Sequence, residues 1–187
     1  MGLLNSGKNR KSIRLKKYDY SWNGLYFVTI CCLKNTSFFG EVIEGEMVLN
    51  TIGKIAHAEW LRTSEIRDYV ILHEFVVMPN HIHMIIELDD TKYKRETSVL
   101  FQSSSRTIGS IVRGYKIAVI KQIKQEVKQY IKQKIQVEHR EDTIPLLLLE
   151  KCMFKIWHRN YYECVIRDER AYENIKRYIQ NNPKKWL

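Results

Sequence analysis

The chain has 187 residues, a length typical of one domain with a substantial hydrophobic core. It carries 31 Lys and Arg against 21 Asp and Glu, a formal charge of +10 that indicates a polyanion as the partner. Hydrophobic residues make up 44%, which argues against a basic disordered tail, and no apolar run approaches the length of a membrane span.

The first part of the chain predicts a basic arm followed by a mixed α and β region. Residues 1–19 form the arm, which is basic and punctuated by glycine and serine. Residues 26–33, YFVTICCL, are rich in β-branched and aromatic side chains and predict a buried strand. Residues 38–49 contain two strand-like runs broken at Gly45, which predicts a hairpin. Apolar residues then recur at helical spacing over 51–65, predicting an amphipathic helix.

The segment 75–88, FVVMPNHIHMIIEL, places two histidines one residue apart inside an apolar strand. A tight turn at Pro79 predicts a hairpin in which the histidines begin the second strand. Successive strand side chains point to opposite faces, so His81 and His83 share one face and could both reach one metal ion. The other interpretation is two ordinary polar residues on a solvated strand face.

The second half of the chain predicts two helices and one more strand. Residues 89–106 form a polar loop, and a long amphipathic helix is expected to begin near Thr107. Residues 125–150 are rich in lysine and predict either a projecting helix or a lineage-specific insertion. Residues 154–166 predict a strand, and a last helix, capped at its start by Asp168, is expected to stop at a proline, residue 183.

The last helix holds a second group of candidate residues. Tyr178 and Asn182 are four residues apart, so they lie on one face of the helix. Near a divalent cation a tyrosine can form a phenolate and attack a phosphodiester. The amide oxygen of Asn182 is a hard ligand that could complete a metal site begun by His81 and His83. In the alternative, Tyr178 packs in the core and Asn182 ends the helix.

Basic residues in two places are candidate DNA contacts. In the arm they are interleaved with aromatic residues, a combination that suits phosphates and unstacked bases. Such an arm can equally be disordered and anchored by its aromatics, and basic residues on the long helix can equally form a solvated face. The candidate contacts are Arg10, Lys11, Arg14, Lys16, Lys17, Arg113 and Lys116.

These segments, in this order, resemble the single-tyrosine transposases of bacterial insertion sequences, and most closely the REP-associated tyrosine transposases. That class belongs to the His-hydrophobic-His (HUH) nucleases. The resemblance covers most of the chain apart from 89–106 and 125–150, and it is carried by RKSIRLKKYDY, YFVTIC, VVMPNHIHMII, IGSIVRGYK and IWHRNYYECVIRDERAYENIKRYIQNNPKKW. It implies that Tyr178 is the nucleophile and that His81, His83 and Asn182 bind a divalent metal.

The resemblance also implies the architecture. It predicts a single α+β domain over 1–187 with the HUH nuclease fold: a ferredoxin-like (RRM-like) antiparallel sheet with helices packed on one face and the tyrosine helix laid across the histidines. The predicted order of strand, helix, hairpin, helix and strand agrees with this fold. A TIM barrel would need about 250 residues and is not expected.

The implied function is metal-dependent cleavage and rejoining of single-stranded, hairpin-containing DNA through a 5′-phosphotyrosine intermediate. The expected cofactor is Mg²⁺ or Mn²⁺, with no ATP, since bond energy is retained and the chain has no GxxxxGK[ST] phosphate loop. We expect a cytoplasmic bacterial protein associated with the nucleoid, without a membrane partner. The sequence does not decide whether the protein forms a homodimer. The alternatives are a non-catalytic DNA-binding regulator, or a replication or conjugation initiator, which would bring a helicase or a second domain.

Overall fold

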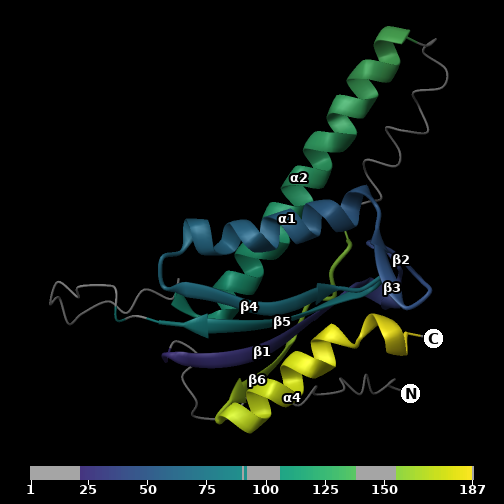
Figure 1. Ribbon diagram of the computed structural model, residues 1–187. Coiled ribbons are helices and arrows are strands. Elements are labelled where there is room, and N and C mark those ends of the chain that lie inside the picture. The colour runs from purple at the N-terminus through teal and green to yellow at the C-terminus, as the bar shows by residue number, and fades with distance from the viewer. Residues whose placement is uncertain (1–21, 90, 92–105, 138–154, 187) are drawn as a thin grey trace, which may run out of the picture.

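The computed structural model describes residues 22–89, 91, 106–137 and 155–186 (Figure 1). The predicted arm over 1–19 and the end of the lysine-rich stretch, 138–150, lie outside the described residues. The elements in chain order are β1 (Gly24–Cys31), η1 (Leu33–Asn35), β2 (Gly40–Ile43), β3 (Glu46–Leu49), α1 (Thr51–Ile66), β4 (Val70–Val77), β5 (His81–Leu88), α2 (Ile108–Val137), β6 (Tyr162–Ile166), α4 (Glu169–Gln180) and η4 (Pro183–Lys185).

Four antiparallel strands form the central sheet, in the order β4-β5-β1-β6. The histidine strand β5 is therefore flanked on both sides, and Thr29 of β1 lies directly opposite His83. β2 and β3 form a separate two-stranded hairpin. Its turn residues Glu44 and Gly45 have positive φ angles of 51° and 79°, the geometry that tight hairpins favour because it matches the twist of the strands. The structure confirms the predicted α+β fold.

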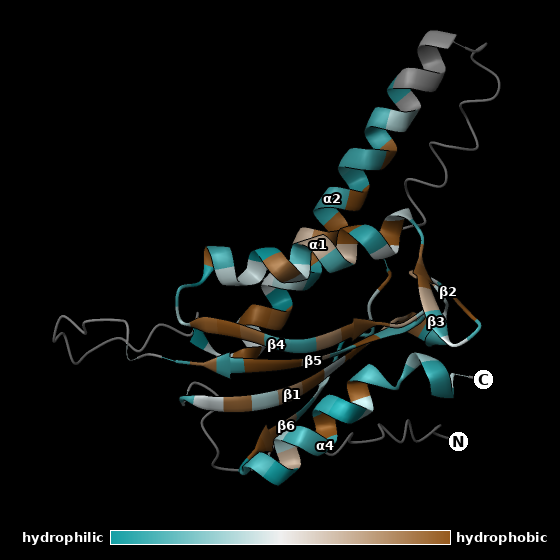
Figure 2. Ribbon diagram, in the orientation of Figure 1, coloured by the Kyte–Doolittle hydropathy of each residue, from teal (hydrophilic) through white to brown (hydrophobic). Residues whose placement is uncertain are grey.

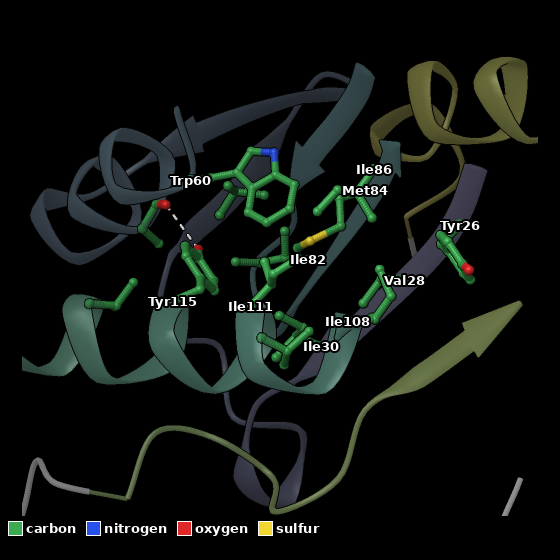
Figure 3. Close-up of a cluster of buried hydrophobic side chains, with 14 of the residues drawn as sticks. Tyr26, Val28, Ile30, Trp60, Ile82, Met84, Ile86, Ile108, Ile111 and Tyr115 are labelled. Atoms are coloured by element: carbon green, nitrogen blue, oxygen red, sulfur yellow. Dashed lines mark hydrogen bonds between the residues drawn. The ribbon is translucent and has the colours of Figure 1, made fainter. Parts of the chain in front are cut away.

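Helices cover both faces of the sheet (Figure 1). α1 and α2 lie on one face, whereas α4 lies across the other face, next to the histidines. The main core fills the space under α1 and α2, and the hydroxyl of Tyr115 on α2 donates to the backbone oxygen of Ala56 on α1 at 2.8 Å (Figure 3). The side chains labelled there are Tyr26, Val28, Ile30, Trp60, Ile82, Met84, Ile86, Ile108, Ile111 and Tyr115.

α4 packs on the sheet through a smaller apolar cluster. Ile85, Ile166 and Ile179 are buried there, with Phe27 and Ile175 partly buried beside them. The rest of α4 is largely hydrophilic, as is much of the coloured part of α2 where it leaves the domain (Figure 2). A helix held by so narrow an apolar seam needs other contacts to fix its orientation.

The start of α4 follows the predicted local signal, and its end comes earlier than expected. The side chain of Asp168 accepts a hydrogen bond from the backbone N–H of Ala171 at 2.8 Å, so it is the predicted N-cap. The helix ends at Gln180, before Pro183, which instead begins the short helix η4. This turn carries Asn182 back toward the sheet.

The first part of the lysine-rich stretch belongs to α2. The helix runs without a break to Val137, and its outer part projects from the domain (Figure 1). Residues 125–137 are therefore a projecting helix. No helix in the described part of the chain is long and apolar enough to cross a membrane.

The predicted strand over 154–166 is wrong in its length. Only Tyr162–Ile166 pairs with β1, and Trp157 makes an isolated bridge with Cys32. The reason lies in Lys116, whose ammonium donates to the backbone oxygens of His158 and Asn160 at 2.9 and 3.2 Å. These carbonyls turn toward α2, so the segment is held in an irregular conformation.

Candidate active site

Strand β5 presents both predicted histidines on the face that α4 covers. Their rings lie 4.5 Å apart between centroids, while Ile82 between them is buried in the main core. The preceding turn is closed by a hydrogen bond from the backbone N–H of Met78 to the backbone oxygen of His81 at 2.8 Å. The alternation predicted from the sequence is confirmed, and the two imidazoles are neighbours.

Helix α4 brings Tyr178 onto His83 from 95 residues away in sequence, with the tyrosine hydroxyl 3.0 Å from Nε2 of the histidine. Phe27 of β1 contacts both rings, stacking on His83 at 5.3 Å and meeting Tyr178 edge-on at 6.2 Å. The ring of Tyr178 is 42% exposed, while the adjacent Ile179 is 1% exposed. Ile179 therefore takes the packing role, and Tyr178 lies beside the histidines at the surface.

Asn182 lies beside the other histidine. It is 9% exposed, and its side chain is hydrogen-bonded to His81. The ring of Trp186 lies 5.8 Å from that of His81. Three elements thus bring together the four predicted residues: β5 supplies the histidines, α4 the tyrosine, and the turn after α4 the asparagine.

Each histidine is oriented by a hydrogen bond at its ring nitrogen Nδ1. Nδ1 of His81 is 2.7 Å from the side-chain oxygen of Asn80, and Nδ1 of His83 is 2.8 Å from the hydroxyl of Thr29. An amide oxygen only accepts, so Nδ1 of His81 carries the proton and its Nε2 is an acceptor. Oxygen partners of this kind are typical of metal-binding histidines, because they fix the ring and its tautomer.

Sequence reasoning missed both of these partners. The position of Asn80 next to His81 in the sequence is a signal for a local contact of this kind. Thr29 carries no signal in the sequence, since its place opposite His83 depends on the register between β1 and β5.

The site keeps both imidazoles neutral. Burial lowers the pKa of His83 to about 3, and the neighbouring His81 adds to this effect. Burial also lowers the pKa of His81, and the hydrogen bond between His81 and Asn182 partly opposes this effect. A neutral imidazole has a free lone pair, which is the form that binds a metal.

The donor set fits a divalent cation. Imidazole nitrogens suit Lewis acids of borderline hardness such as Mn²⁺, and the amide oxygen suits hard Lewis acids such as Mg²⁺. No group of three or more His, Cys, Asp or Glu side chains suited to an ion occurs in the part of the chain that the structure describes. Asn182, which is hydrogen-bonded to His81, is the neighbouring side chain that could supply a third protein ligand.

The basic residues predicted to contact DNA lie away from this constellation or outside the described residues. Arg113 is exposed on α2, the helix on the opposite face of the sheet. Burial lowers the pKa of Lys116 to about 8, and its ammonium is held by the two backbone oxygens described above. The five arm residues, Arg10, Lys11, Arg14, Lys16 and Lys17, are not among the described residues.

Comparison with known proteins places the fold and the family. No family model matches the chain. The fold is similar to that of a solved REP-associated tyrosine transposase bound to a REP hairpin, with a TM-score of 0.53 and 16% identity over 93% of this chain and 76% of that one. The chain is also 37% identical over 186 residues to an uncharacterized protein of Haemophilus influenzae (strain ATCC 51907 / DSM 11121 / KW20 / Rd), covering 95% of this chain and 90% of the relative. It belongs to the same family as that protein.

Proposed function

We propose that this protein is a metal-dependent, single-stranded DNA transposase and endonuclease of the REP-associated tyrosine transposase type, with Tyr178 as its nucleophile. One observation carries the proposal: the hydroxyl of Tyr178 lies 3.0 Å from Nε2 of His83, and the His83 ring lies 4.5 Å from that of His81. The proposed nucleophile thus lies beside the two proposed metal ligands. The fold that the chain shares with a REP-associated tyrosine transposase supports the same function.

His81, His83 and Asn182 are the residues that would hold the cation, Mg²⁺ or Mn²⁺. Such an ion withdraws charge from a phosphate and lowers the barrier to attack on phosphorus. The hydrogen bonds that Nδ1 of His81 and Nδ1 of His83 make with Asn80 and Thr29 would keep both rings in place when the ion enters.

Tyr178 would attack the phosphorus of the scissile phosphodiester. The bond from the tyrosine oxygen to phosphorus forms, the bond from phosphorus to the 3′ oxygen breaks, and the tyrosine proton is balanced by the proton taken up at the new 3′-hydroxyl. A 3′-hydroxyl of another strand would then attack the phosphotyrosine and release Tyr178. One phosphoester replaces another in each step, so the reaction needs no ATP.

Charge and aromatic side chains support DNA as the substrate. The formal charge of +10 favours a polyanion, and the solved structure of similar fold holds a REP hairpin. Phe27 and Trp186 lie beside the histidines, and aromatic rings are common platforms for the bases of single strands. The proposed substrate is single-stranded DNA that contains a hairpin.

The decisive experiment incubates the protein with both single strands of the DNA that flanks its own gene, in Mn²⁺ or Mg²⁺, and measures covalent protein–DNA adducts on denaturing gels. The wild type is expected to form an adduct, and Tyr178→Phe none, because it lacks only the hydroxyl. Tyr162→Phe removes the hydroxyl of another exposed tyrosine and is expected to retain the adduct. Hairpin binding without any wild-type adduct would instead identify a non-catalytic regulator.

A further inference from the structure

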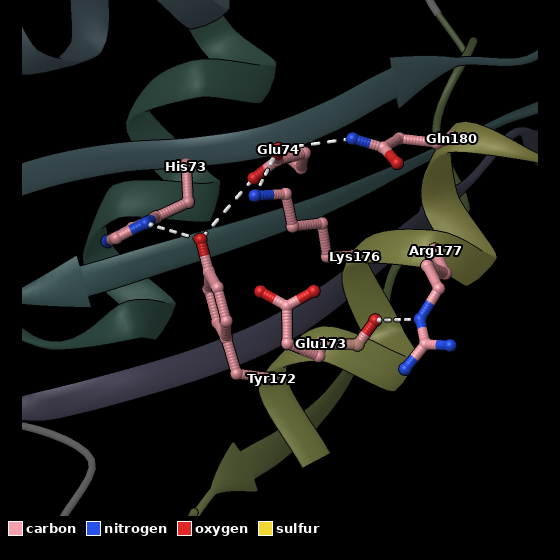
Figure 4. Close-up of polar contacts among 7 residues, drawn as sticks. All are labelled: His73, Glu74, Tyr172, Glu173, Lys176, Arg177 and Gln180. Atoms are coloured by element: carbon pink, nitrogen blue, oxygen red, sulfur yellow. Dashed lines mark hydrogen bonds and ion pairs between the residues drawn. The ribbon is translucent and has the colours of Figure 1, made fainter. Parts of the chain in front are cut away.

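Strand β4 contains an extra residue where it passes α4. His73 and Glu74 together oppose the single residue Ile85 of β5. The strand pairs on either side of this irregularity are Leu72–Ile86 and Phe75–Met84, all of them in the main core or packed against it. An extra residue of this kind, a β-bulge, redirects side chains. Here it lets two consecutive side chains, His73 and Glu74, both point toward α4 (Figure 4).

Glu74 contacts three polar side chains from successive turns of α4. Its Oε1 lies 3.3 Å from Nε2 of Gln180 and 3.3 Å from the ammonium of Lys176. Its Oε2 accepts from the hydroxyl of Tyr172 at 3.4 Å, and Nδ1 of His73 lies 3.1 Å from the same hydroxyl (Figure 4). Because residues four apart share one side of a helix, a single carboxylate holds one flank of α4 over its last two turns.

Tyr178 lies on the other flank of the helix. The apolar seam of Ile175 and Ile179 packs on the sheet between the two flanks. With 3.6 residues per turn, Tyr178 projects a third of a turn or more away from each of the Glu74 contacts. Apolar burial has no direction, so this narrow seam by itself allows α4 to roll about its axis. Directional contacts on one flank remove that freedom and thereby determine where the opposite flank lies.

We propose that Glu74 is a positioning residue that fixes the rotation of α4 and so holds the hydroxyl of Tyr178 beside His83. The proposal rests on the proposed role of Tyr178 as nucleophile. In-line attack on phosphorus requires close alignment of the reacting atoms, and a misplacement of about 1 Å can cost about 100-fold in rate. Glu74 acts through the helix, at a distance from the reacting groups.

The first test observes the position of Tyr178 without any substrate. In the wild type, ring protons of His83 should show NMR cross-peaks both to His81 and to Tyr178, since the ring centroids lie 4.5 and 5.1 Å away. Glu74→Ala is expected to lose the cross-peak to Tyr178 and keep the one between the histidines, because both histidines belong to β5. Persistence of both cross-peaks would overturn the proposal.

Two further variants guard against a general loss of folding. Glu173→Ala removes a carboxylate from the same helix; Arg177 donates to the backbone oxygen of Glu173, and that contact does not need its side chain. This control is expected to keep both cross-peaks. The double variant Lys176→Ala and Gln180→Ala removes two of the three contacts from the helix side and is expected to weaken the cross-peak to Tyr178, as Glu74→Ala does. A double variant indistinguishable from the wild type would contradict the proposal.

The second test separates positioning from binding. In single-turnover experiments, the rate constant for cleavage by Glu74→Ala is expected to be about 100-fold lower than that of the wild type. The affinity of this variant for the hairpin DNA and for Mn²⁺ is expected to be unchanged. Glu74→Gln keeps an acceptor for Tyr172 and Gln180 and is expected to recover part of the rate. A loss of Mn²⁺ affinity in Glu74→Ala would make Glu74 a metal ligand and overturn the proposal. If the wild type does not cleave, the proposed function fails, while the NMR result still decides whether Glu74 positions Tyr178.

Discussion

The hydrogen bond between Thr29 and His83 allows a quantitative test of the metal site. Thr29→Val removes the hydroxyl and nearly preserves the shape of the side chain. His83 is only 6% exposed, and the hydroxyl lies 2.8 Å from its Nδ1. The substitution would therefore leave a buried ring nitrogen without this partner, at a cost of about 1–3 kcal/mol in the free energy of unfolding.

Metal affinity should fall as well, because the imidazole of His83 loses the contact that fixes its orientation. Loss of such a partner typically weakens metal binding by about 10- to 100-fold. Urea unfolding measures the stability, and calorimetric titration with Mn²⁺ measures the affinity. Thr29→Ser keeps the hydroxyl and should stay close to the wild type in both. Wild-type Mn²⁺ affinity and stability in Thr29→Val would refute the reasoning, since the hydrogen bond would then contribute nothing to the ring's position.

Four other predictions concern the metal site, Lys116 and the binding of DNA. His83→Ala should abolish both cleavage and adduct formation, as should EDTA on the wild type; full activity in excess EDTA would exclude the metal site. Lys116→Met should lower the free energy of unfolding by about 1–2 kcal/mol, measured in urea, because two backbone oxygens lose a charged donor; an unchanged value would assign Lys116 no structural role. Charge reversal at Arg10, Lys11 and Arg14 should weaken binding to every DNA and reduce its dependence on salt. In the same salt series the wild type should prefer a single-stranded hairpin to a blunt duplex of equal length, and tighter duplex binding at all salt concentrations would contradict the proposed substrate.

Much of the local structure was readable from the sequence. The alternation in β5 predicted which side chains enter the core and which pair of histidines shares the other face, because strand side chains alternate whatever the strand packs against. The hairpin at Gly45 and the cap at Asp168 depend on the backbone preferences of a few adjacent residues. Such features need no knowledge of distant parts of the chain.

The pairing of the histidines with Tyr178 was predicted by family resemblance, not by spacing. Spacing alone did not distinguish a nucleophile from a packing residue at Tyr178, since a tyrosine among isoleucines on a helix is compatible with both roles. Only the packing of α4 on the sheet decided that Ile179 is buried and that Tyr178 meets His83 at 3.0 Å.

The remaining features of the site were decided by tertiary structure. Thr29 reaches His83 because of strand register, and Glu74 faces α4 because of one extra residue in β4. Lys116, a candidate DNA contact in the sequence, donates hydrogen bonds to backbone oxygens of the segment before β6. In each case the partner lies on another element. For Thr29 and Glu74, a shift of one residue in register would turn the side chain to the opposite face of the sheet. Local sequence determines which side chains can take part, whereas their partners depend on how the elements pack together.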